Sequence, residues 1–186
     1  LRVFDPYWNS SRRPVSGGRG SAALFVAEEP GGGGAVAVDS TGAVLAELPG
    51  LPHELVLPGD EAQGDWTAGV LHGEQVALAG DDRLIKLFDL ESGDLARELS
   101  GHDAEILSHS SDADGHHLLS GARDRNAILW FGSEGEQSDR WVVEHPRAVT
   151  SVAMAADGRA FATTDSGNTL RLWSVDGRRE VMAWPV

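Results

Sequence analysis

Residues 101–130 read GHDAEILSHSSDADGHHLLSGARDRNAILW, and the order of residue types along this stretch decides the fold. The stretch begins with Gly101-His102, continues through the strand-like run Leu118-Leu119-Ser120-Gly121 and a turn at Asp124, and ends on Trp130. Short apolar or alternating runs bounded by Gly, Asp, Ser or Asn are typical of β-strands. The chain shows no apolar stripe with the 3.6-residue period of a helix, so the sequence predicts an all-β protein.

The same scheme recurs at a regular interval. The spacing is 42 residues from Phe88 to Trp130 and 43 residues from Trp130 to Trp173. Asp114-Gly115 has a counterpart in Asp157-Gly158, a turn dipeptide typical of β-hairpins. A period of about 40–45 residues is the length of a four-stranded propeller blade. The repeat therefore predicts antiparallel blades of four strands each.

The order of Gly-His, a strand with a small hydroxyl residue, an Asp turn and a final aromatic residue resembles one blade of the WD-repeat β-propeller family. On this resemblance, residues 1–186 hold about four blades. We expect them at approximately 1–53, 54–101, 102–144 and 145–186, with the first one degenerate. Because the family usually builds seven or more blades, we expect part of a larger ring. Two chains joined into one ring, or a distorted ring of four blades, are the alternatives.

In the family, a His, a Ser or Thr, an Asp and a Trp form a hydrogen-bonded network inside each blade. The resemblance implies such a tetrad from His102, Ser120, Asp124 and Trp130. A network suits these residue types, since each buried polar group without a partner costs about 1–3 kcal/mol. Networks of this kind also hold neighbouring strands in register.

Partial networks are implied in the neighbouring repeats by His145, Thr163, Trp173 and Asp82. Gly167 stands at the Asp position of the last repeat, and Asp165, two residues earlier, is an alternative carboxylate.

A Ser, a His and an Asp could also form a hydrolytic triad. A catalytic serine needs an exposed, strained turn and an oxyanion hole, whereas Ser120 lies within an apolar strand, so we expect no catalytic residue. The alternative function is a propeller enzyme of the hydrolase or lactonase type with a metal in the central channel. It would need metal ligands at equivalent positions of several blades, and the sequence does not repeat any.

A dense group of potential metal ligands lies in the third repeat: His109, Asp112, Asp114, His116 and His117. A metal site requires several ligands that converge on one point. His116 and His117 are adjacent on a predicted strand and would point to opposite faces. We interpret the group as a polar hairpin rim, and we expect neither a metal nor another cofactor.

The formal net charge of −14 argues against nucleic-acid binding, which needs clustered Lys and Arg. The sequence contains no apolar stretch of the roughly 18 residues that a membrane span needs, so no membrane partner is expected. The absence of cysteine fits a reducing compartment, and we expect a cytoplasmic location.

Propellers of this family generally present the loops of one face to protein or peptide partners. The resemblance therefore predicts a non-enzymatic interaction scaffold or sensor module. Other domains of the same parent chain are included among the expected partners, and open blade edges would favour self-association. The candidate partner-binding residues are Asp81, Asp103, Glu105, Arg123, Arg147 and Ser166.

Overall fold

The computed structural model describes residues 66–132 and 139–185, together with the backbone of four strands that precede Trp66. The described residues form only strands, turns and loops, which confirms the all-β prediction. The sequence of Leu1–Asp5 has the composition of a strand, but these residues lie outside the described part of the chain.

The strands form four antiparallel sheets of four strands each, which we call the first to the fourth blade. The first blade contains β1 (Ala23–Glu28), β2 (Ala35–Asp39), β3 (Ala43–Glu47) and β4 (Leu55–Val56). The second contains β5 (Trp66–His72), β6 (Gln75–Gly80), β7 (Leu84–Asp89) and β8 (Leu95–Ser100). The third contains β9 (Ile106–Ser111), β10 (His117–Ala122), β11 (Asn126–Phe131) and β12 (Arg140–Glu144). The fourth contains β13 (Val149–Met154), β14 (Ala160–Asp165), β15 (Thr169–Ser174) and β16 (Arg179–Pro185).

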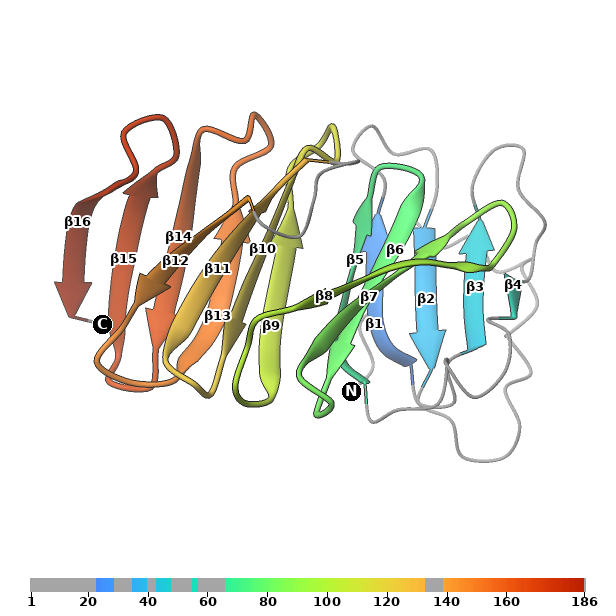
Figure 1. Cartoon of the computed structure of the whole chain (residues 1–186), viewed down its shortest axis with the longest axis horizontal. Coiled ribbons are helices and arrows are strands. Elements are labelled where there is room, and N and C mark those ends of the chain that lie inside the picture. Colours follow the sequence, from blue (N-terminus) through green and yellow to red (C-terminus); the bar gives the residue numbers. More distant parts are fainter. Residues whose placement is uncertain are drawn as a thin grey trace, which may run out of the picture.

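The blades stand side by side in chain order. Their first strands are neighbours, β1 beside β5, β5 beside β9 and β9 beside β13. Figure 1 shows the first and the fourth blade at opposite ends of the molecule. Four-stranded blades that are joined through their first strands have the arrangement of propeller blades, and together they form part of a ring.

The middle of β11 is apolar because both faces of this strand are covered. In β11, Ile128 and Trp130 pack against the second blade, whereas Ala127 and Leu129 pack against the fourth. Successive side chains of a strand point to opposite faces, so a strand buried on both sides has no polar face. The core is thus a series of layers between blades.

Two rims follow from this topology. The upper rim, which is at the bottom of the view in Figure 1, consists of the turns between the second and third strands of each blade and the loops that enter each first strand. The lower rim consists of the hairpins between first and second strands, at residues 73–74, 112–116 and 155–159. A backbone hydrogen bond of 3.1 Å from Ala113 N to Ala156 O joins two neighbouring hairpins of the lower rim.

Candidate functional site: an upper rim above buried polar networks

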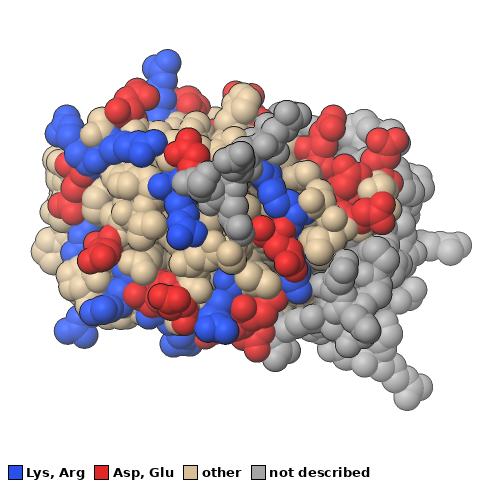
Figure 2. Space-filling model, viewed as in Figure 1, with Lys and Arg blue, Asp and Glu red and all other residues tan. Residues whose placement is uncertain are grey.

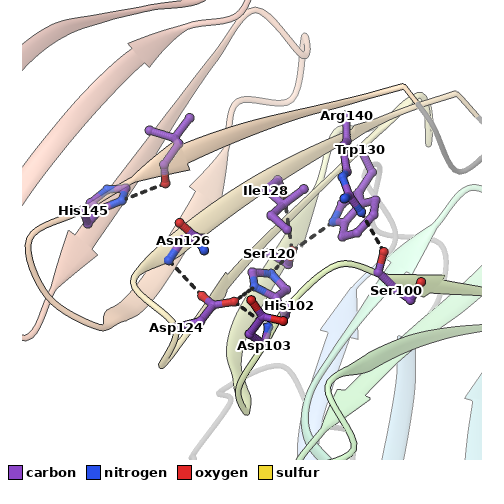
Figure 3. Close-up of polar contacts among 11 residues, drawn as sticks. Ser100, His102, Asp103, Ser120, Asp124, Asn126, Ile128, Trp130, Arg140 and His145 are labelled. Atoms are coloured by element: carbon purple, nitrogen blue, oxygen red, sulfur yellow. Dashed lines mark hydrogen bonds and ion pairs between the residues drawn. The ribbon is translucent and has the colours of Figure 1, made fainter.

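The third blade contains a continuous hydrogen-bonded network (Figure 3). His102 Nδ1 donates to Asp124 Oδ2 at 2.8 Å, and Trp130 Nε1 donates to Ser120 Oγ at 2.9 Å. Ser120 Oγ lies 2.8 Å from His102 Nε2 and can donate to it, because His102 Nδ1 carries the proton shared with Asp124. The structure thus brings the four residues of the implied tetrad together beneath the upper rim.

Asp124 also fixes the backbone on both sides of the rim. Its carboxylate accepts hydrogen bonds from the backbone N–H of Asp103 at 2.9 Å and of Asn126 at 2.9 Å. Burial alone would raise the pKa of Asp124, but the hydrogen bonds from His102, Asn126 and Asp103 outweigh burial and lower the pKa. The carboxylate therefore stays ionised and ties the entering loop to the β10–β11 turn.

The fourth blade keeps part of this network. Trp173 Nε1 donates to Thr163 Oγ1 at 3.0 Å, and Thr163 Oγ1 lies 2.7 Å from His145 Nε2. His145 Nδ1 bonds to the carbonyl oxygen of Val143 at 3.2 Å instead of to a carboxylate. Burial lowers the pKa of His145, which favours the neutral ring.

Two sequence differences in the fourth blade belong together. Gly167 takes the place of Asp124, and Pro146 takes the place of Asp103, whose N–H is one of the donors to Asp124. Proline has no N–H, so this donor and its acceptor are both missing from the fourth blade.

Asp165 is not a substitute carboxylate for His145. Its Oδ2 accepts a hydrogen bond from Arg171 at 2.5 Å, and its Oδ1 accepts one from Gly167 N at 2.9 Å. Burial would raise the pKa of Asp165, but these two contacts lower it.

The second blade has a different polar pair at this place. Asp82 Oδ2 lies 3.1 Å from Lys86 Nζ, a partner that the implied network does not include. The Lys86 ammonium also lies 5.3 Å from the ring centroid of Trp66, a cation–π distance. Lys86 and Arg171 occupy the same register position, opposite Leu78 and Thr163 in the strand before. The sequence analysis missed both cations, although a charged residue in an otherwise apolar third strand was a usable signal.

The candidate partner residues lie on the upper rim, and repeated contacts hold them there. Arg123 N donates to Glu105 O at 3.0 Å, and Ser166 N donates to Ala148 O at 2.8 Å, so each turn rests on the loop that enters its own blade. The side chains of Arg123 and Glu105 also form an ion pair.

The upper-rim side chains reach solvent and carry both charges. Asp81, Asp103, Arg123, Arg147 and Ser166 are exposed, and Glu105 is half-buried. Arg147 lies against Gly167, since a Cβ built at Gly167 would be 2.8 Å from Arg147 Cδ. Figure 2 shows acidic and basic side chains interspersed over the described surface of the third and fourth blades in that view.

The potential metal ligands of the third repeat do not converge. Asp112 Oδ2 pairs with His117 Nδ1 at 2.6 Å, and Asp112 Oδ1 accepts the backbone N–H of His116 and of His117. His109 points instead into the interface with the second blade, and His116 is exposed. The described residues contain no group of three or more ligands arranged to hold a metal ion.

The fold and the buried networks of the third and fourth blades together define a repeat protein that is built from propeller blades. Residues 93–130 and 139–174 match the family model described as WD domain, G-beta repeat. Residues 93–174 therefore carry WD repeats of that family, as the resemblance predicted.

Parts of several named proteins are similar in sequence to this chain. WD repeat-containing protein 37 of Mus musculus is 28% identical over 120 residues, which are 64% of this chain and 23% of that protein. The LEC14B protein of Lithospermum erythrorhizon is 26% identical over 108 residues, which are 55% of this chain and 23% of that protein. Transcription initiation factor TFIID subunit 5 of Caenorhabditis elegans is 26% identical over 101 residues, which are 54% of this chain and 16% of that protein. The similarity thus spans about a quarter or less of each relative.

Within the described part of the chain, no helix has the length and apolar character of a membrane span.

Proposed function

We propose that this chain is a non-enzymatic scaffold that binds a protein or peptide partner on its upper rim. The observation that carries the proposal is the arrangement of Asp81, Arg123 and Ser166, which stand at the same turn position in three successive blades. Together they form a row of exposed side chains at the turns that follow β6, β10 and β14.

The upper rim has the chemistry of a selective protein-binding surface. Its side chains have mixed charges, as in the polar rims of many protein interfaces. The backbone hydrogen bonds beneath Arg123 and Ser166 hold the turns in place before a partner arrives, which lowers the entropy lost on binding. The name of the TFIID subunit 5 relative places that protein in a multisubunit factor, which supports an assembly role for such repeats.

The environment of Ser120 supports a non-catalytic role. Ser120, the serine of the network in the third blade, is completely buried and uses its oxygen for Trp130 and His102. A nucleophile would need access to a substrate carbonyl.

Because the chain contains no cysteine, which suits a reducing compartment, we propose that the scaffold works in the cytoplasm.

Affinity purification from the native source, with charge-reversed variants, tests the proposal. Arg123→Glu combined with Arg147→Glu changes the upper rim, and Arg159→Glu is the control because it reverses one exposed charge on the lower rim. We expect a protein partner to bind the wild type and Arg159→Glu, and to bind the upper-rim variant about tenfold more weakly or not at all. Circular dichroism should show that all three proteins are folded. A partner lost with Arg159→Glu and kept by the upper-rim variant would contradict the proposed surface.

A further inference from the structure

Four of the seven histidines of the chain gather at the lower ends of the second and third blades. His72 ends β5, His109 lies in β9, and His116 and His117 lie at the β9–β10 hairpin. His72 and His109 are buried, with 5% and 8% of their surfaces exposed. We call this interface, which β5 and β6 form with β9, the histidine seam.

The ring of His109 is buried in the histidine seam. Neither ring nitrogen has a partner of suitable geometry among the described residues. The backbone of Gly69 and of Ala77, from β5 and β6 of the second blade, lies near the ring. These two backbone groups favour protonation of His109, the ring of His72 opposes it, and no carboxylate is among the groups that favour it.

His72 joins the two blades directly. Its Nδ1 lies 2.8 Å from Ser111 Oγ in β9. Ser111 Oγ can donate to the carbonyl oxygen of Asp112 or of His117, at 3.1 and 3.2 Å, so it is free to accept a hydrogen bond from His72 Nδ1. The neutral imidazole therefore completes a bridge across the histidine seam.

The charged groups around His72 do not stabilise its protonated form. Asp112 favours the protonated ring, but its carboxylate already accepts hydrogen bonds from His117 Nδ1 and two backbone amides. Arg97, His116 and His117 oppose protonation. Positive charges on His72 and His109 would in addition repel each other.

The next seam along the arc lacks this feature. The register places His109 opposite Ser120, and it places Val152 opposite the equivalent Thr163. Val152 packs in the apolar layer between the third and fourth blades. One seam thus has an imidazole at the position where its neighbour has an aliphatic side chain.

We propose that the histidine seam is an acid-opened joint between the second and third blades. Neutral His72 and His109 keep the two blades together, and protonation of these rings separates them. Burial lowers the pKa of both rings to about 4, against 6.5 for a ring in water. Since the pKa in the closed state is below that in the open state, the closed seam is fully stable above pH 6.5. It weakens as the pH falls from 6.5 toward 4. Between pH 7 and pH 5, the opening equilibrium should rise about 20-fold for each histidine.

Hydrogen exchange of the full chain, measured by mass spectrometry at pH 7 and pH 5 and corrected for the intrinsic pH dependence, tests the joint. We expect amides of β5 and β9 to lose protection at pH 5 relative to those of β14 and β15. His109→Val, which places the aliphatic residue of the next seam here, should reduce the acid-induced rise of the opening equilibrium by a factor of about 20. His72→Gln, which can keep the hydrogen bond to Ser111, should remove a similar part.

His116→Gln is the matched control, because His116 is exposed in the same hairpin and should leave the response nearly intact. If His109→Val fails to fold, His72→Gln alone decides the question. The proposal is overturned if β5 and β9 keep their relative protection at pH 5, or if the variant that combines His109→Val with His72→Gln responds to acid as the wild type does.

Discussion

Asp124 accepts hydrogen bonds from one imidazole and two backbone amides, so a single carboxylate joins the loop that enters β9 to the β10–β11 turn. The side chain of its partner His102 is fully buried, so loss of this acceptor would leave a buried donor unpaired and lower the free energy of unfolding. The fourth blade manages without such a carboxylate because His145 bonds to the carbonyl of Val143. At the scale of single residues, the blades thus satisfy equivalent buried groups in different ways.

Asp124→Ala should destabilise the protein by about 2–4 kcal/mol, since His102 Nδ1 and two amides lose their acceptor. The low pKa of Asp124 means that its contribution is present above about pH 3.8 and is lost as the pH falls through the lowered pKa. Urea denaturation at pH 7 measures the change, with Asp114→Ala as an exposed control. An unchanged unfolding midpoint for Asp124→Ala would disprove the structural role of the network.

Gly167→Asp and Pro146→Asp should stabilise the fourth blade together more than separately. Gly167→Asp alone should change the free energy of unfolding by less than about 0.5 kcal/mol. It must displace the side chain of Arg147 and lies beside Asp165, at 3.0 Å from Cβ to Oδ1. Replacing Pro146 would restore the missing backbone N–H donor, and we expect a favourable coupling of about 1 kcal/mol. A double-mutant cycle measured by urea denaturation tests this, and strictly additive changes would contradict it.

At the scale of elements, the hairpins of the lower rim pack almost backbone to backbone. Gly73 and Gly115 both have positive φ, at 60° and 66°, a conformation that glycine adopts without strain. A Cβ at Gly115 would lie 2.6 Å from the backbone nitrogen of Gly73, whereas a Cβ at Gly73 would meet only Gly115 Cα at 4.0 Å. The close approach therefore depends on Gly115.

Gly115→Ala should destabilise the protein more than Gly73→Ala. Both changes place an alanine at positive φ, at a cost of about 1 kcal/mol, but only Gly115→Ala must also separate two hairpins. We expect about 2–3 kcal/mol for Gly115→Ala, because backbone cannot move aside as a flexible side chain can. Thermal and urea denaturation of the two variants give the comparison. Equal losses would mean that the hairpins are not in close contact.

At the scale of the whole molecule, the fourth blade presents an uncovered apolar face. The strand pairings place Leu170, Leu172, Met182 and Trp184 at the positions that Ala127, Leu129, Trp141 and Val143 hold in the third blade. The third-blade set packs against the fourth blade, whereas Met182 and Trp184 are 47% and 41% exposed. A face of this kind favours association.

The isolated chain of 186 residues should therefore self-associate as its concentration rises, despite its negative charge. Met182→Glu combined with Trp184→Glu should lower the average mass measured by light scattering. Val142→Glu is the control, because Val142 is 43% exposed on the outer strand of a blade that is covered on both faces. A monomeric wild type over a wide concentration range would show that this face does not associate.

The sequence by itself determined the all-β fold and the four-stranded blades. These features depend on spacing along the chain, such as the interval from Trp130 to Trp173, and on strand periodicity. The same spacing indicated that Ser120 and Trp130 share a blade, where the structure joins them by a hydrogen bond.

Only the tertiary structure decided which partners the remaining polar residues have. Asp165 bonds to Arg171 and not to His145, and His109 is buried against the second blade instead of lying on a polar rim. These outcomes depend on how closely two strands or two blades approach each other. Residue spacing predicts which side chains share a strand face, but the position of the neighbouring blade decides which of them lose contact with water.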